Sequence, residues 1–175
     1  MLEELSLHIL DIGMNSLAAG ATVLSIEVLE SARRNWLIIR VRDNGRGMDA
    51  ATLRRVLEQR RSSTKSKRRK GIGLGLALLR QTAEMCGGRF HIRSAPGQGT
   101  TVVASMRLNH VDRPPLGNLD DTVLALCAAN PDVEIRLRYR TDSTTFQFSS
   151  KEREHHEPRT TQTSQREGTA AGCVA

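Results

Sequence analysis

Three short motifs stand in order in the first half of this chain, and together they constrain its fold more than any other feature. Asp11 and Asn15 come first, an aspartate with two nearby glycines follows at 43–48, and three alternating glycines occupy 71–75. Either glycine motif alone would arise by chance in roughly one chain in ten to twenty. Both together, in this order, fall well below about one in a hundred. The combination indicates a single site built from distant segments.

Apolar spacing predicts the elements that carry these motifs. Apolar residues recur at helical intervals over 2–19, and Gly20 supplies the helix end. Alternating runs at 24–28 and 37–41 predict an antiparallel strand pair. Further on we expect a helix over 50–58 capped by Asp49, a helix from the third motif to 87–88, and a hairpin of strands 89–94 and 100–108.

Composition and proline placement predict the remaining organisation. Hydrophobic residues make up 38% of the chain and aromatic residues only 3%, which suits an aliphatic core in a layered α/β sandwich. Two prolines at 114–115 separate residues 1–110 from a smaller helix, strand, strand unit at 117–149, which we interpret as an appendage. Residues 151–175 contain few apolar side chains, so we expect a disordered tail.

Charge and cysteine placement argue against several classes of protein. No apolar stretch approaches the roughly 18 residues of a membrane span, and the N-terminus lacks the positive charge of a secretory signal. The three cysteines lie far apart, which indicates reduced thiols in a cytoplasmic protein. The net charge of +7 equals the seven basic residues at 60–70, so the excess belongs to one loop. Because that loop has no aromatic residue to stack on bases, we do not expect a nucleic-acid partner.

The first motif offers oxygen ligands on one helix face. Asp11 and Asn15 lie one turn apart, so their side chains can converge on a single ion or water. The Asn15 amide with three phosphate oxygens would form an adequate Mg²⁺ site, because this ion keeps several waters. Asp11 could orient or deprotonate a water that attacks a terminal phosphate. The alternative is an ordinary exposed polar stripe.

The second motif places a carboxylate at the end of an apolar strand. Asp43 could accept a hydrogen bond from the exocyclic amino group of a base, a charge-assisted bond of about 1.5–3 kcal/mol. Gly45 and Gly47 would let the backbone pass close to a flat ring. The alternative is a simple hairpin turn, but a helix rather than a strand follows.

The third motif opens a helix directly after the basic loop. Backbone amides at a helix start form an anion site, and basic side chains upstream, Lys65 among them, can close over phosphates. A dinucleotide-binding loop is the rival interpretation. It requires a strand just before the motif and its third glycine one position later, and the sequence meets neither condition.

These motifs resemble those of the superfamily that contains gyrase, heat-shock chaperones, histidine kinases and MutL. Residues 10–22 are similar to its N box, residues 43–48 to its G1 box, and residues 71–75 to its G2 box. Residues 97–100 resemble its late hairpin, so the likeness extends over about residues 3–108. The resemblance implies a Bergerat-type fold, a two-layer α/β sandwich with a mixed, mainly antiparallel sheet and helices on one face.

The resemblance also implies ATP and Mg²⁺ as ligands, with Asn15 on the metal and Asp43 on adenine. Asp11 stands where ATP-hydrolysing members carry a glutamate, so its shorter side chain leaves hydrolysis open. The remaining residues expected to contact ATP are Gly45, Gly47, Met48, Lys65, Gly71, Ile72, Gly73, Leu74, Gly75 and Thr100.

Only ten residues precede Asp11, too few for the helical hairpin and phosphoacceptor histidine of a complete sensor kinase. We therefore expect a stand-alone regulatory protein that consists of an ATP-binding domain at 1–110 and the appendage. It would phosphorylate a partner protein or bind that partner in an ATP-dependent way. Residues 110–117 resemble small stand-alone ATP-binding proteins of the superfamily. The alternative is a non-catalytic module in which ATP only orders the appendage and residues 71–75, which the resemblance implies form a lid over the phosphates. The partner's identity and the formation of a homodimer stay open.

Overall fold

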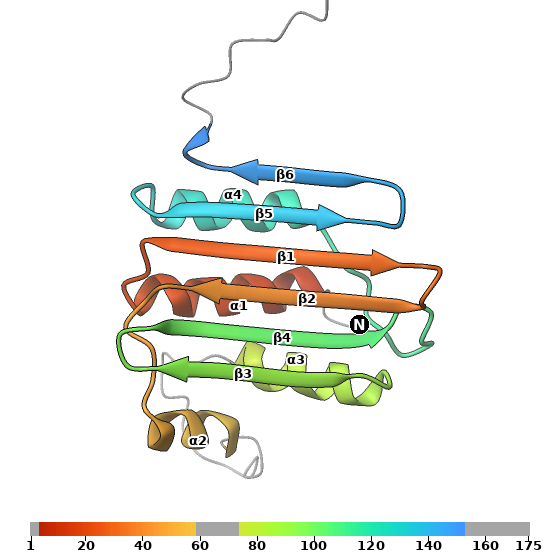
Figure 1. Ribbon diagram of the computed structural model, residues 1–175, viewed down its shortest axis with the longest axis horizontal. Coiled ribbons are helices and arrows are strands. Elements are labelled where there is room, and N and C mark those ends of the chain that lie inside the picture. The colour runs from red at the N-terminus through yellow and green to blue at the C-terminus, as the bar shows by residue number, and fades with distance from the viewer. Residues whose placement is uncertain (1–3, 59–73, 153–175) are drawn as a thin grey trace, which may run out of the picture.

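The computed structural model describes residues 4–58 and 74–152, which form one six-stranded sheet with helices behind it (Figure 1). This arrangement confirms the predicted α/β class. The helices are α1 (Leu5–Ala18), α2 (Ala50–Glu58), α3 (Leu74–Met85) and α4 (Leu119–Ala129). The strands are β1 (Val23–Ser31), β2 (Trp36–Asp43), β3 (Arg89–Ala95), β4 (Gly99–Arg107), β5 (Glu134–Arg140) and β6 (Thr145–Ser149).

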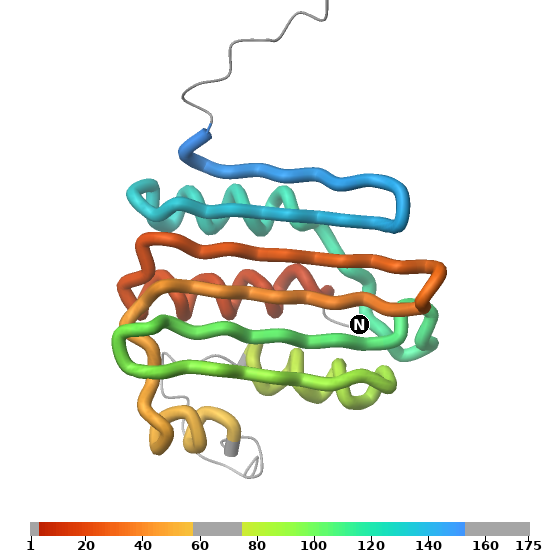
Figure 2. Tube along the Cα trace, viewed as in Figure 1, coloured from red at the N-terminus to blue at the C-terminus, as the bar shows by residue number. Residues whose placement is uncertain are grey.

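The sheet is mixed and mainly antiparallel, with strand order β3-β4-β2-β1-β5-β6. Only the pair β1 and β5 runs parallel, and the other four pairs are antiparallel. The chain trace in Figure 2 shows α1, α3 and α4 crossing the same side of the sheet, while α2 lies beyond its β3 edge. The opposite sheet face carries no helix in the described part of the chain.

Side-chain alternation places the core between the sheet and these helices. Leu24, Ile26 and Val28 of β1 are at most 1% exposed, and they lie in register with buried residues of β2. From α1, Leu5 and Ile9 complete the same core with no exposed surface. Burial of each such side chain contributes about 1.5–3 kcal/mol. The predicted hairpin and its inward-facing residues are therefore confirmed.

The helix and two strands expected at 117–149 are present, and they continue the same sheet. β5 pairs with β1, which precedes it by more than one hundred positions in the sequence. α4 packs on α1 at Gly13, where an added Cβ atom would lie 2.7 Å from the Leu126 side chain. The absence of a Cβ on Gly13 thus permits the close approach of the two helices.

Several predictions concern residues outside the described ranges. The basic loop at 60–70 falls within residues 59–73, which are not described. The expected disordered tail is also not described from residue 153 onward. Within residues 4–58 and 74–152, no helix combines the length and apolar character that a membrane crossing demands.

Candidate functional site

Asp43 is the last residue of β2, and its carboxylate is held by donors from three segments. The residue is only 7% exposed. Its Oδ2 atom accepts a hydrogen bond from Ser16 Oγ of α1 at 2.9 Å. Its Oδ1 atom accepts from the backbone N–H groups of Gly45 at 2.8 Å and Thr100 at 3.2 Å. The carboxylate is therefore oriented from α1, from the following loop and from β4.

The loop that follows Asp43 is tied to both of its neighbours. The Asn44 Oδ1 atom accepts from the backbone N–H groups of Thr22 and Val23, each at 2.9 Å. The backbone N–H of Arg46 donates to Ala19 at the end of α1 at 3.0 Å. These bonds hold residues 44–46 against the α1–β1 connection.

The same loop contacts the β3–β4 hairpin on its other side. The carbonyl of Arg46 accepts from Gly97 N–H at 2.7 Å. Gly47 adopts φ = +68°, and a Cβ atom there would overlap the Ala95 carbonyl oxygen. A residue with a side chain would need a strained backbone and a displaced hairpin. Glycine at 47 thus permits the loop and hairpin to lie in direct contact.

Two hydroxyl groups join the loop to the hairpin strands. The backbone N–H of Met48 donates to Ser94 Oγ at 2.8 Å. Ser94 Oγ lies 2.9 Å from Thr100 Oγ1, a hydrogen bond in which either group can donate. Ser94 and Thr100 are register partners in β3 and β4. Ser94 thereby positions the side chain of Thr100, the residue whose backbone N–H donates to Asp43.

These segments enclose a cavity of about 450 Å³, within the size range of small-molecule sites. Its apolar and polar lining residues both come from α1, β2, β4, α2 and the connecting loops, and α3 adds one apolar residue. The apolar residues are Ile12, Ala18, Ala19, Val41, Met48, Val56, Leu76, Pro96 and Val102, and the others are Asn15, Ser16, Asp43, Arg46, Gly47, Asp49, Thr52 and Thr100. The mixture suits a flat apolar ring with a polar edge.

Five of the residues predicted from the sequence line this cavity together. They are Asn15, Asp43, Gly47, Met48 and Thr100. They come from positions 85 residues apart in the chain, so the fold brings the first motif, the second motif and the late hairpin to one place. Gly45 was also predicted. Its backbone N–H donates to the Asp43 carboxylate, but Gly45 is not among the described lining residues.

The first and third motifs also meet. A Cβ atom on Gly75 would lie 2.6 Å from the Asp11 Cβ atom, so the start of α3 packs directly against this aspartate. Asp11 is exposed and is not among the described residues that line the cavity. Leu74 begins α3, and the predicted contacts Lys65, Gly71, Ile72 and Gly73 lie outside the described residues.

Asn15 is the predicted metal ligand among the residues that line this cavity. No three His, Cys, Asp or Glu side chains cluster as a metal site within the described ranges. Asn15 supplies one amide oxygen at the cavity wall. Mg²⁺ commonly takes few protein ligands and completes its shell with phosphate oxygens and water. The donor set therefore suits a metal that arrives with a phosphate ligand.

Two serines of the site were not predicted from the sequence. Ser16 holds Asp43 from 27 positions earlier, and Ser94 links Met48 to Thr100. Ser16 directly follows Asn15, so its place on the helix was a usable signal. Ser94 could have been found from the hairpin register, because a turn over 96–98 sets it opposite Thr100.

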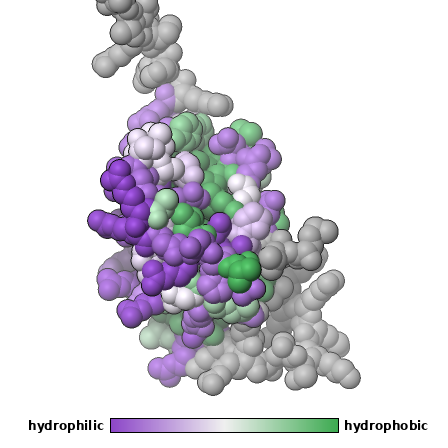
Figure 3. Space-filling model, turned by 90° about the vertical axis from the view of Figure 1, so that its right-hand side faces the viewer, coloured by the Kyte–Doolittle hydropathy of each residue, from purple (hydrophilic) through white to green (hydrophobic). Residues whose placement is uncertain are grey.

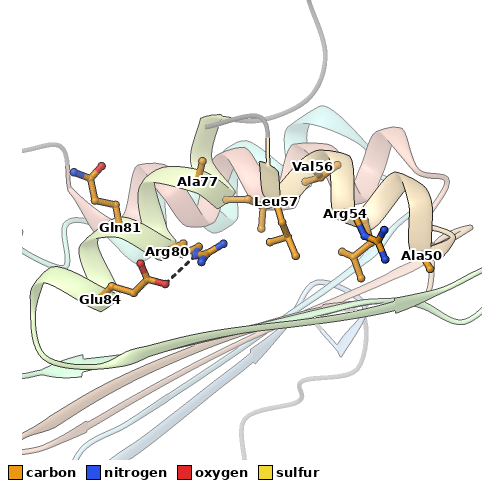
Figure 4. A pocket seen from close by; sticks show the side chains of 10 residues that line it. Ala50, Arg54, Val56, Leu57, Ala77, Arg80, Gln81 and Glu84 are labelled. Carbon is orange, nitrogen blue, oxygen red and sulfur yellow. Dashed lines mark hydrogen bonds and ion pairs between the residues drawn. The ribbon is translucent and has the colours of Figure 1, made fainter. Parts of the chain in front are cut away.

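A second cavity of about 710 Å³ lies between α2 and α3 (Figure 4). It shares Val56 and Leu76 with the first cavity. Figure 4 shows Arg80 turned toward Glu84 within it, and the two form an ion pair at 2.8 Å. Neither Asp43 nor Asn15 is among its described lining residues, so the motif chemistry belongs to the smaller cavity.

This fold is a two-layer α/β domain with a cavity at the end of β2, between α1 and the β3–β4 hairpin. The family model described as "Histidine kinase-, DNA gyrase B-, and HSP90-like ATPase" matches residues 1–110. The chain therefore belongs to this family, as the motif resemblance implied.

Relatives of this chain include a protein named as a virulence sensor. The chain is 29% identical to the virulence sensor protein BvgS of Bordetella bronchiseptica over 121 residues, which are 67% of this chain and 10% of BvgS. It is 35% identical to the non-motile and phage-resistance protein of Caulobacter vibrioides over 98 residues, 54% of this chain and 12% of that protein. The chain thus spans about a tenth of the length of these curated relatives.

One similar solved structure is the Aquifex aeolicus MutL ATPase domain complexed with ADP. The two structures align with a TM-score of 0.47 and 17% sequence identity, over 83% of this chain and 64% of the MutL chain.

Proposed function

We propose that this chain binds Mg²⁺–ATP in the cavity at the end of β2, with Asp43 reading the adenine amino group. The observation that carries the proposal is the buried Asp43 carboxylate on the cavity wall. A carboxylate offers about four acceptor positions. Three are used, two on Oδ1 and one on Oδ2. Oδ2 therefore retains capacity for one more donor, which the exocyclic amino group of adenine supplies.

The cavity walls support a planar base beside this carboxylate. Val41 of β2 and Val102 of the neighbouring β4 are register partners close to the end of β2, and Met48 lies on the loop. Apolar contacts on the ring faces favour binding without selecting a base, and the Asp43 hydrogen bond then selects a ring with an amino group at that edge. Thr100 adds a hydroxyl at the same end of the site.

The triphosphate would extend toward Asn15 and the start of α3. Asn15 would hold Mg²⁺ through its amide oxygen, and the bound ion would neutralise phosphate charge. The first backbone N–H groups of a helix have no acceptor within the helix, and this general property would favour an anion at the start of α3. The contact between Gly75 and Asp11 brings that helix start beside the α1 face on which Asn15 lies.

We propose further that ATP occupancy regulates a partner protein, through phosphorylation of it or through ATP-dependent binding to it. Support for a regulatory role comes from the family and from relatives that are named as sensor proteins. A non-catalytic switch is the second candidate. It is favoured by one observation, that Asp11 is exposed and absent from the described cavity lining.

Alanine substitutions on α1 separate the two candidates. If Asp11 acts as a general base, Asp11→Ala should lower ATP turnover or phosphotransfer by about a hundredfold or more while ATP still binds. Asn15→Ala should abolish the Mg²⁺ dependence of ATP affinity. Met14→Ala is the matched control, because Met14 lies on the same helix at 45% exposure and does not line the cavity.

The assay uses radiolabelled ATP with the wild-type chain, alone and with cellular proteins. Transfer of label to a protein, or release of phosphate, that is lost in Asp11→Ala supports the catalytic form. Unchanged turnover in Asp11→Ala contradicts the general-base role. A wild-type protein that binds Mg²⁺–ATP but neither turns it over nor transfers phosphate is a switch.

A further inference from the structure

The sheet face opposite the helices is rich in outward-facing arginine. Strand alternation sends every second side chain to this face, and β2, β3, β4 and β5 each contribute at least one exposed arginine to it. In Figure 3 the face that points to the viewer in Figure 1 lies on the left, where strongly hydrophilic residues gather. The basic loop accounts for the net charge of the whole chain, yet the fold concentrates positive charge here as well.

A hollow of about 320 Å³ lies on this face between β5, β1 and β2. Arg40, Arg138 and Arg140 surround it, and Leu29 and Ile38 form its apolar floor. Leu29 stands opposite Ile38 on one side and Arg140 on the other, so the floor and one wall belong to the same cross-strand row.

A second hollow of about 370 Å³ continues the first toward the β1–β2 and β5–β6 turns. It shares Leu29 and Arg140 with the first and adds Arg33 and Arg34. The Asp142 carboxylate links the two turns, since it accepts from Ser31 Oγ at 2.7 Å and from Arg33 N–H at 3.0 Å. We call the two hollows together the arginine groove.

The arginine groove carries more positive charge than its own carboxylates neutralise. Its lining includes five arginines and only two carboxylates, those of Glu27 and Asp142. Glu27 forms an ion pair with Arg40 at 3.0 Å. Among the described residues, Arg34, Arg138 and Arg140 form no ion pair. Arginine side chains in this state favour bidentate binding of carboxylate or phosphate.

We propose that the arginine groove binds an acidic protein segment with apolar side chains among its carboxylates. The apolar floor at Leu29 and Ile38 gives such a segment a place for a leucine or valine side chain between the arginines. No aromatic ring is among the described lining residues, as stacking of nucleic-acid bases would require. On the same face, the Trp36 ring is covered by the Arg107 guanidinium at 4.3 Å.

The arginine groove and the cavity at the end of β2 lie on opposite faces of the sheet, so binding at one need not obstruct the other. A regulatory protein requires a partner, and an acidic segment would be the part of that partner that binds here. The purpose of this binding rests on the proposed function, but the existence of the arginine groove does not.

The test measures binding of a fluorescein-labelled peptide of four Glu-Glu-Leu repeats to the full chain by fluorescence anisotropy, without nucleotide. Arg138→Glu/Arg140→Glu should lower the affinity at least about tenfold. Arg89→Glu/Arg93→Glu is the matched control, because it makes the same charge change on the same face but on β3, outside the groove. We expect it to lower the affinity less than about threefold.

A second variant guards against a folding defect in β5. Arg33→Glu/Arg34→Glu alters only the β1–β2 turn and should also lower peptide affinity about tenfold, with an unchanged circular dichroism spectrum. Equal losses in the groove and β3 variants would overturn the groove in favour of diffuse charge. Failure of the peptide to bind at low salt would overturn it, and so would tighter binding of a single-stranded oligonucleotide or anionic vesicles.

ATP affinity measured on the same variants separates this inference from the proposed function. The groove variants should bind ATP like the wild type. Peptide binding without ATP binding would contradict the proposed function and leave the groove intact. ATP binding without peptide binding would contradict the groove alone.

Discussion

Gly47→Ala tests the close contact between the loop after Asp43 and the β3–β4 hairpin. An alanine at φ = +68° costs about 1–2 kcal/mol for the left-handed backbone. Its Cβ would also overlap the Ala95 carbonyl, and relief of such overpacking costs about 1–3 kcal/mol more. Loss of glycine entropy in the unfolded chain offsets about 0.4–1 kcal/mol of this. We therefore expect a net destabilisation of about 1–5 kcal/mol.

Gly97→Ala is the control that isolates the overlap. Gly97 has φ = +72°, almost the same as Gly47, but no atom lies within 4 Å of its added Cβ. Backbone strain and unfolded-state entropy are thus nearly equal in the two variants. Their free energies of unfolding should differ by the overlap alone, about 1–3 kcal/mol.

Urea denaturation of both variants measures this difference directly. ATP affinity should fall at least about tenfold in Gly47→Ala, because a displaced loop moves a cavity wall, and should stay within about twofold of wild type in Gly97→Ala. Equal free energies of unfolding for the two variants would refute the close contact between loop and hairpin.

Two further predictions concern residues 117–149, which form α4, β5 and β6. Leu126→Ala should destabilise the protein by about 2–5 kcal/mol in urea unfolding, because this fully buried side chain packs on Gly13, and a loss below about 1 kcal/mol would show that α4 is dispensable to the core. Hydrogen bonds from the backbone N–H of Arg33 and, second, from the Ser31 hydroxyl lower the pKa of Asp142. The charged carboxylate therefore stabilises the fold at pH values above the unfolded-state pKa. This contribution is lost as the pH falls through the folded-state pKa. Asp142→Asn should therefore be less stable than wild type at neutral pH and equal to it in strong acid, whereas a stability difference independent of pH would contradict the role of this carboxylate.

The elements of this fold could be predicted because their signals are local. Alternation at 24–28 and 37–41 sets the inward faces of β1 and β2, and Asp49 caps α2 through a 2.6 Å bond from Thr52 N–H. Pairing between distant strands leaves no such local signal. The sequence predicted a helix and two strands over 117–149, but the parallel pairing of β5 with β1 depends on the path of the chain through α3, the hairpin and α4.

Charge placement shows the same limit. Outside the basic loop the sequence is electrically balanced, with 19 basic and 19 acidic residues, and no charged face was expected. Alternate positions in β5 nevertheless place Arg136, Arg138 and Arg140 on one side of the sheet. A sequence with equal numbers of basic and acidic residues can therefore still form a charged surface, because alternation along a strand can place residues of one charge on one face of the sheet.

For the site, the motifs identified residues whose type is restricted by chemistry, such as Asp43 and Gly47. Supporting residues were missed because serine is common on helices and strands, and its role depends on which side chain the fold brings opposite. Ser16 gains its role only when Asp43 lies 2.9 Å away.

The central claim, that Asp43 reads the base of a bound ATP, is tested most directly by isothermal titration of wild type and Asp43→Asn. ATP, ADP and a non-hydrolysable analogue are each titrated with and without Mg²⁺, and circular dichroism verifies the fold of the variant. Asparagine keeps the shape but loses the charge, and its amide can place a donor against the adenine amino group. We predict a loss of about 1.5–3 kcal/mol, or roughly ten- to hundredfold in affinity, for all three nucleotides. Equal affinity of wild type and Asp43→Asn would contradict the claim.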